Sequence, residues 1–189
     1  PLTWINREKY MLEGVDYGRE PIYKRTEFNT VGWDYLNTMG VKLLEGRGFD
    51  ARDKAGSPLT AVVTEKFARR NFADGSAVGK RFKVAEREQD ENGYLDGWYT
   101  IIGVVNDVVH GSPNAKAVER DSIFVSLEQR PKHSIYIVVK TKKSLTEIRD
   151  MLSQVAYKLD PNNAPYLFTT GEIVKKRGLA YLNFVSMVF

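Results

Sequence analysis

The sequence predicts an α+β fold divided into two lobes, and two patterns carry this prediction. Residues 134–170 contain a β-branched run, a long amphipathic helix and a returning run, which together form a β-α-β unit. Residues 31–130 alternate short apolar runs, turn residues and a helical segment, which is typical of a second α/β lobe. We therefore assign residues 1–30 and 132–178 to one discontinuous β-α-β lobe, and residues 31–130 to a smaller lobe inserted into it.

The first elements follow from local periodicity. Ile22–Asn29 is predicted to be a strand because it alternates in polarity and is rich in β-forming residues. A second alternating segment covers Tyr10–Gly14, and the stretch from Gly14 to Pro21 is a turn region. Trp33–Met39 is predicted to be a short helix with one apolar face that ends at Gly40.

The next part of the inserted lobe is expected to form a bend, a strand and a helix. Val41–Leu44 leads to a bend at Gly46–Gly48, which small residues allow, and a polar loop follows. Leu59–Val63 is a β-branched run, and Thr64 is placed to cap a helix over Glu65–Phe72. In this helix the residues expected to face inward are Phe67, Ala68 and Phe72, and those expected to face outward are Lys66, Arg69 and Arg70.

Four further strands are predicted. Lys80–Ala85 and Trp98–Val105 are joined by the acidic segment Glu86–Gly97, which has the composition of a long exposed hairpin loop. The other two strands are Ser122–Leu127 and the strongly β-branched Ser134–Thr141.

The best-defined helix is Ser144–Leu159. Ser144 and Glu147 have the spacing of a capping box, in which each side chain bonds the backbone of the other. Apolar residues then recur on one face, and Asp160–Asn163 ends the helix. A returning strand is predicted at Tyr166–Thr169.

The composition is that of an ordinary globular unit, with 42% apolar and 28% charged residues. The chain has no cysteine, which excludes a disulfide framework and a Cys-ligated metal site. The net charge of +4 permits an acidic partner. The basic residues are spread in short runs, however, which favours solvated faces over nucleic-acid binding. These runs are Lys66, Arg69 and Arg70; Lys140, Lys142 and Lys143; and Lys175, Lys176 and Arg177.

We expect no complete membrane-spanning segment in this sequence. No basic and apolar leader follows Pro1, so we expect no signal peptide, and no apolar stretch reaches the length of a spanning helix. The nearly uncharged tail at 179–189 is interpreted as the start of a membrane-proximal helix. The alternative is an amphipathic helix that completes the domain.

The sequence lacks a recognisable catalytic or cofactor motif. Gly75–Lys80 has one residue too few between its glycines for a phosphate-binding loop, and Arg81 stands where Ser or Thr would hold magnesium. The acidic stretch beginning at Asp90 has its glycine too early for a calcium loop. His110 and His133 are not in a metal-binding spacing, and no serine lies in a nucleophile motif. We therefore expect no enzyme activity and no cofactor.

Four segments carry a family resemblance. They are Val31–Asp53, Thr60–Phe72, Gly79–Phe82 and Tyr99–Gly111, and they occur in an order that resembles the extracytoplasmic core domain of MacB-like and FtsX-like ABC-transporter permeases. The residues that match the signature and are expected to be structural are Tyr35, Gly40, Gly46, Arg47, Phe49, Asp53, Gly79, Gly103 and Asp107.

Two of these residues allow alternative interpretations. In the functional interpretation, Arg47 and Asp107 form a buried ion pair or contact a partner. In the structural interpretation, Arg47 hydrogen-bonds strand ends and Asp107 caps a turn. We favour the structural interpretation, because burying an unpaired charge is costly. The aromatic residues Trp33, Tyr35, Phe49 and Trp98 are expected to fill the core.

The resemblance implies a porter-like lobe interrupted by the smaller lobe, in a dimeric permease of the bacterial inner membrane with this domain on the periplasmic side. Its partners would be a cytoplasmic ATPase and, outside the membrane, an adaptor, a lipoprotein carrier or a hydrolase regulator. The domain would transmit movement rather than catalyse a reaction, as part of an export or efflux machine. The alternative is a stand-alone module that binds peptide, lipid or sugar between its lobes. A partner contact is predicted on the acidic loop, at Asp90, Glu91, Asn92, Tyr94 and Asp96.

Overall fold

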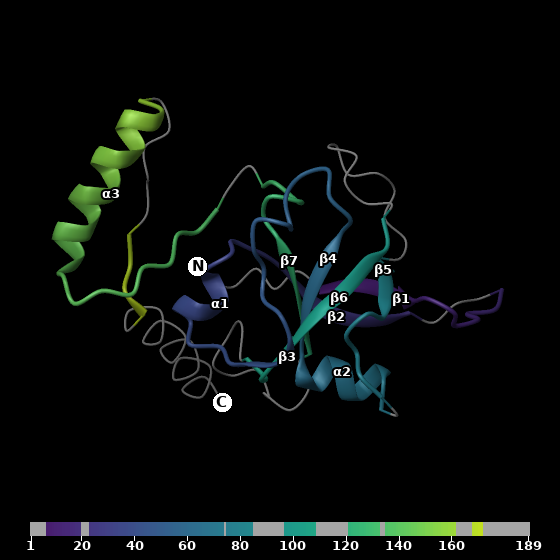
Figure 1. Cartoon of the computed structure of the whole chain (residues 1–189). Helices are drawn as coiled ribbons and strands as arrows, with labels where there is room; N and C mark the ends of the chain where they lie inside the picture. The colour runs from purple at the N-terminus through teal and green to yellow at the C-terminus, as the bar shows by residue number, and fades with distance from the viewer. Residues whose placement is uncertain are drawn as a thin grey trace, which may run out of the picture. The chain divides into compact units, whose positions relative to one another are not determined.

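The structure is a computed structural model, and it describes residues 7–19, 23–73, 75–84, 97–108, 121–132, 135–161 and 168–171. Contacts divide the chain into two compact units: the larger holds the described residues up to Val138, and the smaller holds those from Val139 onward. A mixed sheet with helices forms the larger unit (Figure 1), which confirms the α+β class.

The elements are short. The strands are β1 (Arg7–Leu12), β2 (Lys24–Val31), β3 (Leu43–Gly46), β4 (Thr60–Thr64), β5 (Arg81–Val84), β6 (Tyr99–Val105) and β7 (Ser122–Ser126). The helices are α1 (Tyr35–Thr38), α2 (Glu65–Asn71) and α3 (Leu145–Leu159). Most of these lie within a residue or two of the predicted bounds. Among the strands, β1 extends further toward the N-terminus than the alternating segment did.

The sheet of the larger unit closes on itself. Its strand order is β3-β6-β4-β7-β2-β1-β5, and β5 also pairs with β6 through Arg81↔Thr100 and Phe82↔Tyr99. Six strands therefore form a ring, and β3 is attached to its outside along β6. The pairs β2–β7 and β4–β6 are parallel and the remaining pairs are antiparallel. Closure leaves few strand edges to protect within the described residues.

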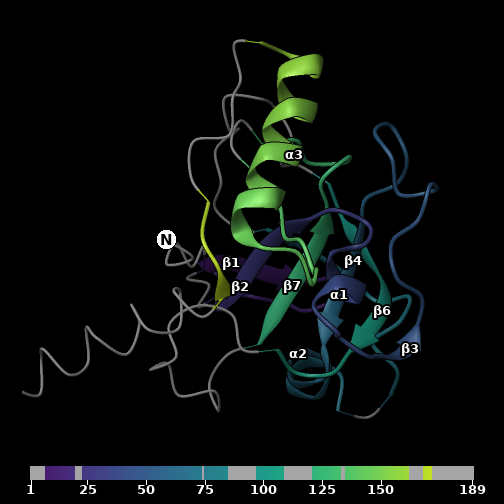
Figure 2. The same cartoon turned by 90° about the vertical axis from the view of Figure 1, so that its left-hand side faces the viewer.

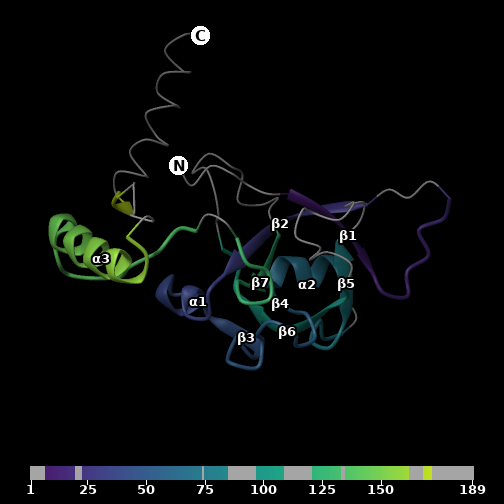
Figure 3. The same ribbon diagram turned by 90° about the horizontal axis from the view of Figure 1, so that it is seen from above.

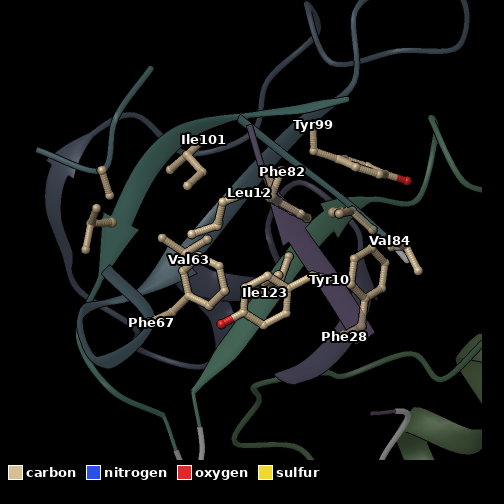
Figure 4. Packing of buried hydrophobic residues seen from close by; sticks show 14 residues of the cluster. Tyr10, Leu12, Phe28, Val63, Phe67, Phe82, Val84, Tyr99, Ile101 and Ile123 are labelled. Carbon is tan, nitrogen blue, oxygen red and sulfur yellow. The ribbon is translucent and has the colours of Figure 1, made fainter. Parts of the chain in front are cut away.

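Aromatic and aliphatic side chains fill the interior of the ring (Figure 4). The rings of Phe82 and Tyr99 are stacked, with centroids 5.4 Å apart. Helix α2 closes one end of the ring (Figure 3). Its Phe67 ring centroid lies 5.1 Å from that of Tyr10 and 6.1 Å from that of Phe82. The predicted cap of α2 is confirmed, since the Thr64 side chain accepts from the amide of Phe67.

A second, smaller cluster covers the outer face of β4, β6 and β7. Helix α1 lies beside β4 and β7 there (Figure 2), and Leu36 of α1 and Phe49 pack against Val62, Phe124 and Val105. Strands β4 and β7 are consequently buried on both faces along their whole length. This explains why they appear in the sequence as compact apolar runs rather than as alternating strands.

The structure differs from the expected lobe division at the N-terminus. Strands β1 and β2 lie inside the ring, where Phe28 pairs with Ile123 of β7. Residues 7–30 thus belong with the sheet of the larger unit rather than with the α3 segment. The periodicity of a strand gives its buried face but does not identify the distant strand that pairs with it.

In the smaller unit, α3 and its capping box are confirmed. The Ser144 amide donates to Glu147 Oε2 (2.8 Å), and the Glu147 amide donates to Ser144 Oγ (3.3 Å). The strand predicted at Ser134–Thr141 is not formed at the described residues 135–141, which are exposed and in no ladder. β-branched residues favour an extended backbone, but a strand also requires a partner to pair with. Of the strand predicted at Tyr166–Thr169, only residues 168 and 169 are described, and they too are in no ladder.

Candidate functional site at the Arg47–Asp53 loop

The site begins where β3 crosses β6 at two glycines. Gly46 and Gly103 are register partners, and a Cβ on Gly103 would lie 2.2 Å from the carbonyl oxygen of Arg47. A Cβ on Gly46 would lie 2.2 Å from the carbonyl oxygen of Ile102, and Gly46 also has a φ of +73°. Only glycine fits at either position, so the two strands are held in unusually close contact.

This close contact fixes the start of the next segment. The Arg47 amide donates to the Ile102 carbonyl at 2.9 Å, which anchors the residue that follows β3. The Arg47 guanidinium then turns back and binds both oxygens of Asp53, with distances of 2.7 and 3.0 Å. A bidentate pair of this kind fixes geometry as well as contributing energy.

Asp53 is the buried centre of the loop. Besides Arg47, its carboxylate accepts from the Asp50 amide (2.9 Å) and from Thr60 Oγ1 (2.8 Å). Burial alone would raise the pKa of Asp53, but these hydrogen bonds together outweigh burial and hold its pKa below the ordinary value. The same contact raises the pKa of Arg47, chiefly through its hydrogen bond to Asp53. The carboxylate is therefore charged and fully engaged by its own chain.

The network continues to the end of β7. Gln129 Oε1 accepts from the Thr60 amide (3.1 Å), and Gln129 Nε2 donates to the carbonyl of Pro58 (2.8 Å) and to Ser57 Oγ (3.0 Å). Ser126 Oγ donates to the carbonyl of Asp53 at 2.8 Å. The 47–60 loop is thus tied to β7 and to the strand it leads into, β4.

The outer rim of the loop is charged and exposed. Arg52 binds both oxygens of Asp50, through Nε (2.9 Å) and Nη2 (2.6 Å). Hydrogen bonds from the Arg52 side chain and amide, in that order of strength, lower the pKa of Asp50. Arg47 Nη1 also approaches Asp50 at 3.4 Å, so the rim is linked to the buried pair.

A depression of about 270 Å³ lies beside this loop. Its walls come from α1, from β3 and from the loop, and its lining residues are Leu36, Asn37, Val41, Leu43, Arg47, Gly48, Phe49, Asp50 and Val105. The charged members of the lining, Arg47 and Asp50, already bond each other and their neighbours. The depression therefore offers a partner both polar and apolar surface, and its charged groups are already paired within the loop.

Two further signature residues sit at the junctions of neighbouring elements. Asp107 Oδ1 accepts from the Lys66 amide (2.9 Å) in the first turn of α2, so this carboxylate joins the end of β6 to the helix. Gly79 adopts a φ of +85° and donates its amide to the Ile101 carbonyl (2.8 Å). The structure thus gives Arg47 and Asp107 separate partners, and the Arg47–Asp107 ion pair considered from the sequence is not formed.

The remaining signature residues support the outer cluster. Phe49 is buried in it and Tyr35 is partly buried against it, where burial raises the pKa of the phenol. Gly40, with a φ of +72°, ends α1. Trp33, expected in the core, is exposed by 38%. Trp98 is half-buried and stacks with cations instead.

The structure also brings in residues that the sequence did not single out. Thr60 and Gln129 complete the network around Asp53, and Arg70 of α2, expected to face solvent, binds the buried Asp121 at 2.8 Å. A single polar residue in a strand, a helix or a turn carries no signal of this kind, because its partner is distant in sequence. The predicted contact loop (Asp90, Glu91, Asn92, Tyr94 and Asp96), both histidines, the third basic run and residues 179–189 lie outside the described residues.

The described residues contain neither a metal-binding cluster nor a membrane-spanning helix. No cluster of three or more His, Asp or Glu side chains there is arranged to hold a metal ion. No helix in that part of the chain has both the length and the apolar character needed to cross a membrane.

A family profile described as "MacB-like periplasmic core domain" matches residues 6–155. The chain belongs to this family. A curated relative, the macrolide export ATP-binding/permease protein MacB 1/2 of Paracoccus denitrificans (strain Pd 1222), is 35% identical over 60 residues. That match covers 32% of this chain and 9% of the relative, so the chain spans only a small part of the length of that protein.

Solved structures of the MacB-like group share the fold. The periplasmic region of MacB from Actinobacillus actinomycetemcomitans aligns with a TM-score of 0.58 and 15% identity, over 91% of this chain and 71% of that one. The extracellular domain of the noncanonic ABC-type transporter YknZ from Gram-positive bacteria aligns with a TM-score of 0.50 and 16% identity, over 89% and 85%. These likenesses place the chain in an extracytoplasmic fold that ABC-type permeases use.

Proposed function

We propose that this MacB-like periplasmic core domain is a mechanical part of an ABC-type export permease and has no catalytic centre of its own. ATP binding and hydrolysis by a cytoplasmic ATPase would move membrane helices of the same permease. The domain would convert that movement into opening, closing or pushing outside the inner membrane. The name of the Paracoccus relative, which joins ATP-binding and permease functions, supports this assignment.

The observation that carries the proposal is that the buried carboxylate among the signature residues forms its hydrogen bonds within the chain itself. Asp53, the most buried of them, receives four hydrogen bonds from Arg47, Asp50 and Thr60. These bonds join the loop to β4, and Gln129 joins it to β7. A carboxylate saturated in this way stiffens the fold and is not available to bind or transform a substrate. Stiff bodies are what a force-transmitting part requires, because only elements with discrete packings transmit a switch.

The partners proposed for the permease follow the same logic. We propose a homodimeric permease with an extracytoplasmic partner, such as an adaptor, a lipoprotein carrier or a hydrolase regulator. The acidic segment Glu86–Gly97 is our candidate for the contact. Recovery of the partner from envelope extract should fall for a full-length permease that lacks this segment, and unchanged recovery would remove the segment from consideration.

The coupling role is tested in the full-length permease with its ATPase in native membranes. Asp53→Asn keeps the volume of the side chain but breaks the charge-assisted bonds that stiffen the loop, and Asp50→Asn is the matched control on the exposed rim. We expect Asp53→Asn to leave ATP hydrolysis close to wild type while export of a macrolide, the compound class in the relative's name, falls. Permease levels in the membrane are equalised before the comparison.

Three results would contradict the proposal. The first is normal export by the Asp53→Asn permease after its loop has been shown to be loosened by hydrogen exchange. The second is a parallel loss of hydrolysis and export, which would indicate failed assembly instead of uncoupling. The third is a peptide, lipid or sugar that stabilises the isolated chain strongly, which would favour the competing hypothesis of a stand-alone binding module.

A further inference from the structure

The outward face of β2, β1 and β5 is basic. Alternate residues of β1, such as Tyr10 and Leu12, point into the ring, so Lys9 and Met11 between them face outward. Lys9 is the register partner of Arg25 on β2, and Met11 is the register partner of Lys83 on β5. The three strands therefore present cations side by side. In Figure 3, β1 and β2 lie on the side of the ring opposite β4 and β6.

Aromatic rings lie among these cations. The Trp98 ring, just before β6, has Arg81 at 5.5 Å and Lys83 at 5.4 Å from its centre. On the other flank, Lys9 lies 6.0 Å from the centre of the Tyr23 ring. We call this surface, made of Lys9, Met11, Tyr23, Arg25, Arg81, Lys83 and Trp98, the basic face.

Acidic groups do little to balance the basic face in the described part of the chain. Glu13 binds Arg81 at 2.7 Å, and the next outward carboxylate on β2, Glu27, is buried and accepts from Ser122. Arg25 and Lys83 form no ion pair with any described residue. Like charges placed directly opposite each other across two strands weaken a sheet. The Lys9–Arg25 register pair therefore places two cations side by side on this face of the sheet.

The combination of cations with Trp and Tyr indicates the chemistry of a partner. Trp and Tyr prefer the boundary of a membrane, where an apolar ring and a polar edge are both accommodated. Lys and Arg near that boundary are attracted to anionic headgroups. A nucleic-acid site would instead need a helix or ribbon that enters a groove of the duplex, or a long basic groove that follows single-stranded nucleic acid. The short β-strands of a closed ring supply neither.

We infer that the basic face docks on the anionic phospholipid headgroups of a membrane. The cations bind phosphate groups, and Trp98, Tyr23 and Met11 lie at the level of the headgroups. This inference goes beyond the proposed coupling role, since vesicle binding needs neither ATP nor an export partner. It would hold this unit against the bilayer surface by attraction that weakens with salt.

The experiment measures co-flotation of the whole 189-residue chain with lipid vesicles. The probes are vesicles of phosphatidylcholine mixed with phosphatidylglycerol, and vesicles of phosphatidylcholine alone. The test variant carries Lys9→Glu, Arg25→Glu and Lys83→Glu. It keeps like charges opposite each other between β1 and β2. The matched control carries Lys140→Glu, Lys142→Glu and Lys143→Glu, which alters the net charge equally on an exposed segment of the smaller unit.

We expect wild type and control to bind the anionic vesicles and to leave them as salt is raised. Replacing the three cations of the basic face by glutamate should weaken this binding by more than about 100-fold, since each cation near an anionic surface contributes roughly a factor of five to ten. Equal binding to neutral vesicles, or equal losses in the two triple variants, would overturn the inference. So would a chain that ignores vesicles yet binds polyglutamate through the basic face, which would identify an acidic protein as the partner. Matching circular dichroism spectra of all three proteins establish that each is folded.

Discussion

Gly46 and Gly103 lie opposite each other across β3 and β6, and a Cβ on either one would lie 2.2 Å from a backbone oxygen of the facing segment. Arg47 follows Gly46 directly, so this contact also decides where the guanidinium that holds Asp53 begins. Two glycines distant in sequence thus set the position of the most connected ion pair in the loop.

Gly103→Ala tests this relationship. The added Cβ would meet the Arg47 carbonyl at 2.2 Å, a backbone atom that has no rotamer by which to escape. We expect a loss of about 1–3 kcal/mol in the free energy of unfolding, as for other over-packed sites. The measurement is urea unfolding of the chain. Gly48→Ala is the control, because nothing lies within 4 Å of its Cβ, and it should change stability by less than about 0.5 kcal/mol. Equal stability of the two variants would show that β3 relaxes away from β6 without cost.

Asp53→Asn should be among the more damaging single changes in the larger unit. It replaces an acceptor of four hydrogen bonds by an amide whose own N–H groups face the donors of Arg47 and Thr60. We expect a loss of about 2–4 kcal/mol, the range for one partner removed from a buried charged network. Asp50→Asn, on the exposed rim, should change unfolding little. A small effect at Asp53 would mean that ordered water replaces the lost bonds.

The depressed pKa of Asp53 predicts a pH dependence. The folded state holds this carboxylate ionised more firmly than the unfolded state does. Its stabilising contribution is therefore complete above the unfolded pKa of about 3.9 and is lost as the pH falls through the lower folded pKa. The difference in unfolding free energy between wild type and Asp53→Asn should be constant near neutrality and should shrink below that pH. A difference that stays constant into strong acid would contradict the assigned charge state.

Ser144→Ala tests the smaller unit. It removes the side chain that accepts from the Glu147 amide and so opens the first turn of α3. We expect a loss of about 1 kcal/mol, the usual effect of deleting an N-cap. Hydrogen exchange at the first amides of α3 measures it locally. Thr146→Ala, one turn position away and exposed, provides the comparison and should leave these amides protected.

Local chemistry made several parts of this fold predictable. Thr64 and Ser144 predicted the starts of their helices, because a hydroxyl just before an apolar helical stripe commonly caps the helix by accepting a hydrogen bond from a backbone amide of the first turn. Arg47 and Asp53 were identified as signature residues, but their mutual pairing was not, since Asp107 was an equally reasonable partner on chemistry alone. Three-dimensional proximity decided between them.

Other parts were beyond local reasoning. The closure of β5 on β6 brings Phe82 beside Tyr99, and no periodicity encodes which strand lies next to which. The same limit placed residues 7–30 in the wrong lobe. It also produced a strand at Ser134–Thr141, whose residues have strand-forming side chains without a described neighbour to pair with. Intrinsic preference decided the backbone shape there, and tertiary context decided the pairing.

The closed ring has a consequence for how this unit assembles during synthesis. Glu27 of β2 meets Ser122 of β7 across 95 positions of the chain, and this parallel pairing is one of the joints of the ring. Contacts so far apart make for slow folding, because the entropy of closing the intervening loop opposes them until late. A ribosome must therefore release nearly the whole unit before its second strand finds its neighbour. A nascent chain halted ahead of Asp121 lacks β7, so the edges of β2 and β4 that face it would have no strand to pair with.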